Sequence, residues 1–213
     1  ATHFQTARRE RRCGNDLLLF LAHRLSDGCR GELCQSHRNR KKESVDTDKF
    51  KVYSLSFMEG EPLSDNLFLI SVKLVNKDNQ AFSQSYYMTG LEPTALSDVQ
   101  RTFEAPEYET TVGIDLTKLD AAQIAAQIAQ AKTMLPEGHS FKSVGSYQIE
   151  EDVPAGNSVF NRNKTFGKQH TSFVVRFTED GKETESSAGK TSYIYYEAEV
   201  TVEPDGTLSI EEN

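Results

Sequence analysis

Apolar and polar residues alternate over much of the chain after residue 48, and a period of two predicts β-strands with one packed and one wetter side. The cleanest alternation runs through residues 191–203, with Ile194, Tyr196, Ala198, Val200 and Val202 on the packed side. Residues 67–75 form a nearly continuous apolar run, LFLISVKLV, that is typical of a buried strand. Further strands are expected at residues 49–57, 81–88, 141–149, 171–178 and 207–210. In the first of these, Tyr53, Leu55 and Phe57 are expected on one side.

The period changes once, between residues 116 and 135, where apolar residues recur at helical spacing. This stripe, one face of a 3.6-residue helix, consists of Ile124, Ile128, Ala131 and Leu135. Thr117 followed by Asp120 approximates a capping box, and Pro136 stops the helix. Gln127 is expected on the solvent side, so Gln127→Asp should be nearly silent whereas Ile128→Asp should unfold the domain.

The order of these elements, strands followed by one helix and then more strands, predicts the fold class. We expect an α+β domain, β-rich overall, with a mostly antiparallel sheet and one amphipathic helix, about residues 117–135, packed on one face. A short helical turn is expected near residues 96–103. Residues 150–170 form a long polar stretch interrupted by Gly and Asn, and a loop of this length is usually functional or disordered.

Charge divides the chain near residue 43. The 213 residues carry a net charge of −8, but residues 1–42 hold ten basic and four acidic residues, a net charge of +6. The remainder holds 14 basic and 28 acidic residues, a net charge of −14. All three cysteines and three of the five histidines also lie in residues 1–42. The sequence therefore predicts a basic N-terminal segment, residues 1–42, and a single acidic domain, residues 43–213.

Three functional interpretations compete for the N-terminal segment. In the first, four arginines before the apolar run Leu17–Ala22 form a targeting sequence, and residues 25–29 resemble a lipoprotein cleavage box whose Cys29 carries lipid. Asp27 and one extra residue depart from that box. In the second, Cys29, Cys34 and His37 bind zinc, although no C-x2-C pair supports the site.

In the third interpretation, basic residues 38–42 bind nucleic acid or another anionic surface. Against all three stands the simpler possibility that residues 1–42 are a disordered extension or sequence not native to the domain. Under that reading, a chain starting at Glu43 should keep the melting temperature of the full chain. The acidic domain itself is not expected to bind nucleic acid, because it would repel the polyanion.

Sequence motifs for catalysis are largely absent from the acidic domain. Residues 188–191, AGKT, end like a phosphate-binding loop, but Thr184 stands where its first glycine should be and a strand follows in place of a helix. No cysteine follows Cys34, which excludes a cysteine nucleophile in this domain. His139 and His170 lie near no nucleophile elbow. Glu197 and Glu199 share a strand face, which is more typical of solvated carboxylates than of a glycosidase pair.

The candidate binding surface combines the wet side of residues 191–203 with the loop 150–170. The strand supplies Tyr193 and Tyr195, which offer contact area at low entropic cost, together with Glu197. The loop supplies an unusual basic cluster in an acidic domain, namely Arg162, Lys164, Lys168 and His170. The alternative is that these cations only neutralise nearby acids, each interaction contributing little at a wet surface.

The sequence therefore favours a non-enzymatic binding or interaction domain, for a small polar ligand or a partner protein, in an extracytoplasmic setting and without a cofactor. One alternative is an enzyme with a carboxylate or histidine site in the loop 150–170, for which Glu151 and His170 are the candidates. A second alternative is a structural module that pairs through a sheet edge. No apolar run approaches the roughly 18 residues of a membrane-spanning helix.

Overall fold

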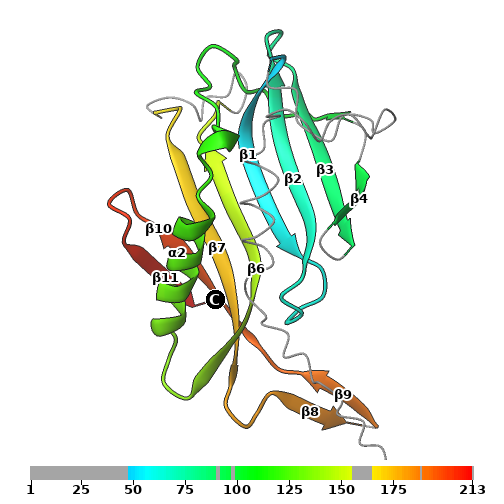
Figure 1. Ribbon diagram of the computed structural model, residues 1–213, viewed down its shortest axis with the longest axis vertical. Coiled ribbons are helices and arrows are strands. Elements are labelled where there is room, and N and C mark those ends of the chain that lie inside the picture. Colours follow the sequence, from blue (N-terminus) through cyan, green and yellow to red (C-terminus); the bar gives the residue numbers. More distant parts are fainter. Residues whose placement is uncertain (1–47, 90–91, 97–98, 155–164, 188, 213) are drawn as a thin grey trace, which may run out of the picture.

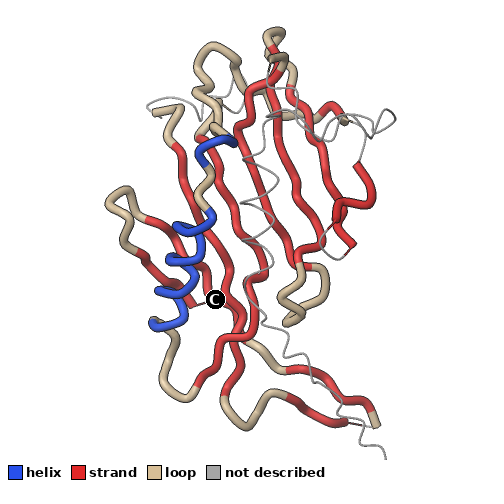
Figure 2. Tube along the Cα trace, viewed as in Figure 1, coloured by secondary structure: helices blue, strands red, loops and turns tan. Residues whose placement is uncertain are grey.

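A computed structural model describes residues 48–212 except 90–91, 97–98, 155–164 and 188. One large antiparallel sheet dominates it, and the only described α-helix, α2, packs on one face of that sheet (Figures 1 and 2). The predicted α+β, β-rich class is therefore confirmed. Within the described residues, no helix has the length and apolar character needed to cross a membrane.

The sheet has the strand order β11-β10-β7-β6-β1-β2-β3-β4, with β5 also paired to β3, and β8 and β9 form a separate two-stranded sheet. The elements in chain order are β1 (Phe50–Glu59), β2 (Leu67–Asn76), β3 (Ala81–Thr89), β4 (Glu92–Leu96), β5 (Gln100–Arg101), η3 (Leu116–Lys118), α2 (Ala121–Thr133), β6 (His139–Glu151), β7 (Gln169–Glu179), β8 (Thr184–Ser187), β9 (Lys190–Tyr193), β10 (Tyr196–Val202) and β11 (Leu208–Glu212).

The two faces of the large sheet differ in chemistry, because residues directly opposite each other on paired strands share a face. The apolar face is defined by a row across seven strands: Ile210, Val200, Phe173, Tyr147, Phe57, Ile70 and Tyr86. The polar face is defined by a second row: Ser209, Thr201, Ser172, Gln148, Ser56, Ser71 and Ser85. The core lies against the apolar face.

Helix α2 begins one turn later than predicted. Asp120 is its N-cap and accepts hydrogen bonds from the backbone N–H groups of Ala122 and Gln123, so the predicted capping box from Thr117 is wrong. Gln127 is also misassigned to solvent: it is 8% exposed and accepts a 2.7 Å hydrogen bond from the Tyr147 hydroxyl on β6. Gln127→Asp would therefore bury a charge against the core and should not be silent.

Two further sequence predictions were wrong. The predicted strand 191–203 is broken after Tyr193, and its first part pairs with β8 in a hairpin that projects from the large sheet (Figure 1). Ile194 and Tyr196, predicted to be packed, are 36% and 44% exposed. No helical turn occurs among the described residues of 96–103, where β4 ends and β5 pairs with β3. The AGKT sequence leads into β9 and not into a helix, as its flanking sequence predicted.

Candidate functional site

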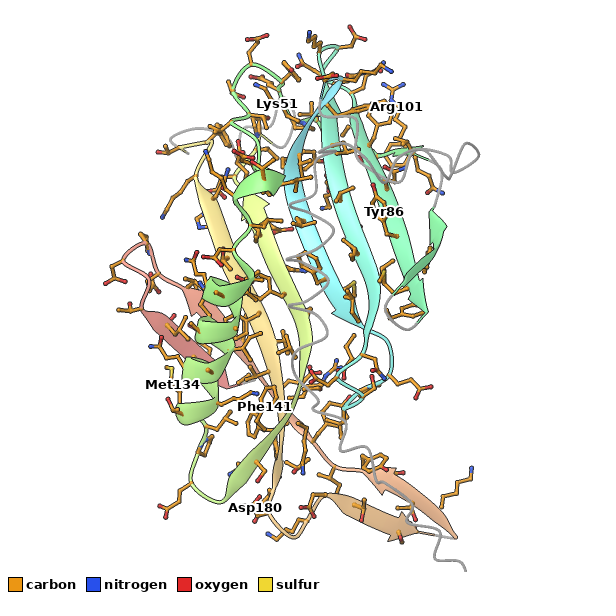
Figure 3. The ribbon with its side chains drawn as sticks, viewed as in Figure 1. Lys51, Tyr86, Arg101, Met134, Phe141 and Asp180 are labelled. Atoms are coloured by element: carbon orange, nitrogen blue, oxygen red, sulfur yellow. The ribbon has the colours of Figure 1, made fainter. Side chains whose placement is uncertain are left out.

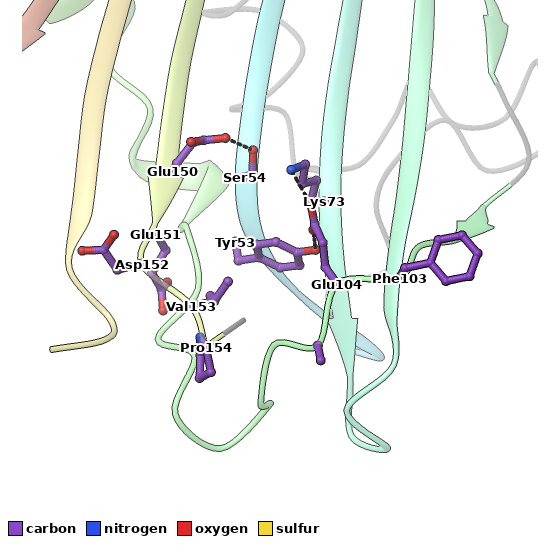
Figure 4. A pocket seen from close by; sticks show the side chains of 11 residues that line it. Tyr53, Ser54, Lys73, Phe103, Glu104, Glu150, Glu151, Asp152, Val153 and Pro154 are labelled. Atoms are coloured by element: carbon purple, nitrogen blue, oxygen red, sulfur yellow. Dashed lines mark hydrogen bonds and ion pairs between the residues drawn. The ribbon is translucent and has the colours of Figure 1, made fainter. Parts of the chain in front are cut away.

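A cavity of about 460 Å³ opens at the end of the sheet where β1 begins and β6 ends. Its walls come from β1, β2, the segment after β5 and the end of β6 (Figure 4). The lining residues are Tyr53, Ser54, Lys73, Phe103, Glu104, Ala105, Glu150, Glu151, Asp152, Val153 and Pro154. The volume falls in the range of sites that hold a small molecule, roughly 300–1,000 Å³.

A β-bulge in β1 delivers Tyr53 to this cavity. The register of β1 against β2 shifts between Val52 and Ser54, so Tyr53 has no direct partner on β2. Its side chain leaves the apolar side shared by Leu55 and Phe57, and its hydroxyl donates a hydrogen bond to Oε2 of Glu104. The sequence placed Tyr53 on one side with these two residues, because a regular alternation cannot reveal a bulge.

Lys73 meets the same carboxylate from β2. Its Nζ lies 2.7 Å from Oε1 of Glu104, so the lysine and Tyr53 each occupy one carboxylate oxygen (Figure 4). Burial alone would raise the pKa of Glu104, but the hydrogen bonds from Lys73 and Tyr53 outweigh it and hold that pKa below its ordinary value. Burial, together with the neighbouring Glu104, raises the pKa of Tyr53, so its phenol stays protonated.

The opposite wall of the cavity is acidic. Glu150 lies opposite Ser54 in the β1–β6 pairing and accepts a 3.1 Å hydrogen bond from its hydroxyl. Among the described residues, no cation pairs with Glu150, whose side chain is exposed. Asp152 lies nearby and is 2.7 Å from Nε2 of His170. Glu150 thus presents a carboxylate with only a neutral partner.

Glu151 is a structural anchor in this arrangement. It is 5% exposed, and its two carboxylate oxygens accept 2.7 Å hydrogen bonds from the backbone N–H groups of Val112 and Gly113. Gly113 has a φ of 92°, a conformation that favours glycine. Both acceptor oxygens are occupied, so Glu151 fixes the segment before η3 against the end of β6.

The cavity as a whole carries net negative charge. Four acidic residues and one lysine line it, a net charge of −3. Within the described part of the chain, no three His, Cys, Asp or Glu side chains converge in a way that would hold a metal ion. Phe103 at the rim is fully exposed, and the half-buried Val153 adds apolar surface beside the buried Pro154. The arrangement has the features expected of a site for an organic cation with an apolar body.

The residues predicted from the sequence are not gathered in one place. His170 and Lys168 lie at the end of β7 near the cavity, where His170 contacts Asp152. Tyr196 pairs with Phe177, seven residues further along β7, which is about 23 Å away in a strand. Lys51 and Asp180 mark these two ends of the sheet in Figure 3. The predicted surface therefore splits between opposite ends of the sheet.

Other predicted residues lie elsewhere. Tyr193 is 69% exposed on the β8–β9 hairpin. The remaining predicted residues lie outside the described part of the chain: Arg162, Lys164, Cys29, Cys34 and His37. Their proposed roles in ligand, zinc or lipid attachment stay predictions.

Tyr195 and Glu197 belong to a second charged group, which we call the Arg176 cluster: Glu59, Ser143, Arg176, Tyr195 and Glu197. Arg176 donates to Oε2 of Glu59 at 2.5 Å and to Oε1 of Glu197 at 2.7 Å. Its guanidinium carbon lies 5.6 Å from the centre of the Tyr195 ring. Burial alone would lower the pKa of Arg176, but the two carboxylates raise it above its ordinary value.

Sequence reasoning missed Tyr53, Lys73 and Glu104. Tyr53 and Lys73 contact Glu104 across 51 and 31 residues of chain. The one local signal was the lysine inside the apolar run 67–75, because a charge in a buried strand needs a partner. Comparison of the chain with protein families, with curated proteins and with solved structures finds no match.

Proposed function

We propose that this protein is a binding module for a small organic cation, a primary ammonium or guanidinium group attached to an apolar body. The observation that carries the proposal is Glu150, a carboxylate at the cavity whose only described partner is the neutral Ser54 hydroxyl. A carboxylate in a cavity of net charge −3 favours a cationic ligand, which would gain a charge-assisted hydrogen bond there.

Apolar side chains at the cavity support the second part of the proposal, that the ligand has an apolar body. Phe103 is exposed over its whole side chain at the cavity rim, and the half-buried Val153 lies on the other side, next to the buried Pro154 (Figure 4). A ring or alkyl group placed between them would remove apolar area from water, which is favourable. Phe103 and the carboxylates thus suit the two ends of one amphipathic molecule.

The state of the other polar groups favours binding over catalysis. The raised pKa of Tyr53 keeps its phenol a hydrogen-bond donor, and Glu104 is already engaged by both Tyr53 and Lys73. Both carboxylate oxygens of Glu151 accept hydrogen bonds from backbone N–H groups. Each carboxylate oxygen of Glu104 and Glu151 already accepts one hydrogen bond, and the Tyr53 phenol stays protonated, so none of the three residues is poised to act as a general base.

The proposal is tested by titrating the full chain with benzylamine and with benzyl alcohol, its neutral counterpart, at pH 7. We expect saturable binding of the cation and at least several-fold weaker binding of the alcohol. Glu150→Gln should weaken benzylamine binding roughly fivefold, a change near 1 kcal/mol. Glu137→Gln, an exposed residue in the turn before β6, is the matched control and should leave the affinity unchanged.

Equal affinity for amine and alcohol would contradict the cationic specificity. Unchanged benzylamine affinity in Glu150→Gln would remove Glu150 from the site. Absence of saturable binding by either probe at millimolar concentration would contradict the proposed ligand class.

A further inference from the structure

The apolar face of the large sheet is much wider than one helix. Its defining row crosses seven strands, from Ile210 on β11 to Tyr86 on β3. Neighbouring strands lie about 4.8 Å apart, so six intervals span roughly 29 Å. An α-helix with its side chains is about 10–12 Å across. Helix α2 is therefore wide enough for only about a third of this face.

Helix α2 lies over one part of the face. Gln127 of α2 accepts a hydrogen bond from the Tyr147 hydroxyl. Nζ of Lys132 lies 4.0 Å from the centre of the Phe141 ring. Both aromatic residues belong to β6. Figure 1 shows α2 in front of the part of the sheet formed by β7, β10 and β11. Residues 111–119 reach the other half at the start of β1, where the backbone N–H of Ile114 donates to the carbonyl of Val52 at 2.7 Å.

The half of the apolar face formed by β1, β2 and β3 is nevertheless buried from solvent. Four of its side chains are 5% exposed or less: Ile70, Val72, Leu74 and Met88. Burial also raises the pKa of Tyr86, at the far end of the row, to about 12. A sheet face stays out of water only when a second layer of structure covers it. This half therefore requires a covering element in addition to α2.

We propose that residues 17–25 of this chain are that element, lying beside α2 on the β1–β3 half of the apolar face. Leu18, Leu21, Ala22 and Leu25 recur at i, i+3, i+4 and i+7, which is one apolar stripe of a helix. Nine residues of helix are about 14 Å long and add roughly another 10 Å of cover across the strands. Two helices packed side by side are 8–10 Å apart, a spacing that suits this width.

Chain length and charge favour this segment over a second copy of the protein. Residues 26–47 link residue 25 to the first described residue, Asp48, which lies two residues before the start of β1. These 22 residues can extend to about 75 Å, more than twice the roughly 33 Å length of a ten-residue strand such as β1. A tethered segment also acts at an effective concentration near millimolar. Residues 1–42 carry +6 and the remainder −14, so the two attract each other.

The chain carries its own reporters for this contact, because its three methionines occupy three different environments. Met88 is buried on the β1–β3 half of the apolar face, Met58 is 41% exposed, and Met134 ends helix α2. Figure 3 shows Met134 at the end of the helix, well away from Tyr86 on β3. In the full chain with 13C-labelled methionine methyl groups, Leu18→Asp should move the Met88 signal and leave those of Met58 and Met134 in place.

The melting temperature provides the second readout. Leu18→Asp should lower it by on the order of 5–10 °C, since a charge then faces an apolar surface. Gln5→Asp introduces the same charge outside the apolar stripe, and we expect it to change neither the Met88 signal nor the melting temperature. Unchanged Met88 in Leu18→Asp, or an equal response to Gln5→Asp, would overturn the proposal.

Two other outcomes would also overturn it. If the full chain sediments as a dimer and the Met88 signal moves only on dilution, a second copy covers the face. If mass spectrometry of the protein from cells shows a chain that begins at Cys29, residues 17–25 are absent from the mature protein. Neither outcome bears on the cation site, which is tested separately through Glu150.

Discussion

Two charge networks each combine a glutamate, a cation and a hydroxyl group, yet they differ in how far their charged side chains are exposed. In the Arg176 cluster, Glu59 is 1% exposed and Arg176 is 18% exposed. In the cavity network, Glu104 and Lys73 are 43% and 40% exposed. The centre of the first network, Glu59 with Arg176, is largely buried, although Glu197 at its edge is 42% exposed. The second network borders a cavity that water and ligands can enter.

The number of free acceptors explains the difference. Oε1 of Glu59 accepts from the Ser64 hydroxyl and from the backbone N–H of Asp65, while Oε2 accepts from Ser143 and Arg176. This carboxylate has no capacity left for a ligand. At the cavity, Glu104 is paired, but among the described residues Glu150 accepts only from Ser54. The buried carboxylate of Glu59 therefore stabilises the fold, whereas the exposed carboxylate of Glu150 remains available to bind a ligand.

Removing the cation from each network should produce the largest contrast. Arg176→Met leaves Glu59 charged, buried and without its ion-pair partner, so we expect a loss of about 3–5 kcal/mol in the free energy of unfolding. Lys73→Met removes the partner of a half-exposed carboxylate that water can reach, and should cost less than about 1 kcal/mol. Chemical denaturation of both variants measures the difference. Equal losses would mean that the two networks are not distinct in kind.

The next largest difference in stability is expected between substitutions of Tyr195 and Tyr193, the two tyrosines selected from the sequence. Tyr195 lies over the Arg176 guanidinium, so Tyr195→Ser should lower the free energy of unfolding by about 1–2 kcal/mol through lost cation–π contact and apolar cover. Tyr193 is 69% exposed on the projecting hairpin, so Tyr193→Ser should change the free energy of unfolding by less than about 0.5 kcal/mol. A large loss in Tyr193→Ser would show that the hairpin packs against the fold.

The last expected effect, at Tyr53, is mainly a change in the pKa of Glu104. Tyr53→Phe removes one of the two donors that hold the pKa of Glu104 low, so that pKa should rise toward its ordinary value, and stability should fall by about 1 kcal/mol at neutral pH. A lowered folded pKa gives stability that is present above the unfolded pKa and lost as pH falls through the folded pKa. Carboxyl NMR titration between pH 2 and 6 should show the rise, and an unchanged Glu104 midpoint would contradict it.

Local patterns predicted the regular elements well, because alternation and helical spacing depend on residues near in sequence. Strands such as β2 and β7 were located to within about two residues, as was the far end of α2. The start of α2 was misplaced because Thr117 was taken as its cap. Thr117 instead donates to Asp115, the N-cap of η3, and Asp120 is the N-cap of α2.

The cavity could not be predicted in the same way. Tyr53 reaches it through a bulge, and its contact with Glu104 crosses 51 residues of chain. Gln127 was assigned to solvent because its partner, the Tyr147 hydroxyl, lies 20 residues away on β6. In both cases a long-range hydrogen bond decides where a polar side chain lies, and no local pattern carries that information.

The most direct test is an amide chemical-shift map of the full chain with benzylamine at pH 7, recorded against benzyl alcohol. The predicted result is a saturable set of shifts at Tyr53, Ser54, Lys73, Glu104 and Glu150, with none at Glu59, Ser143 or Arg176, and a much weaker response to the alcohol. Shifts centred on the Arg176 cluster, or an equal response to both probes, would contradict a cation site at the cavity.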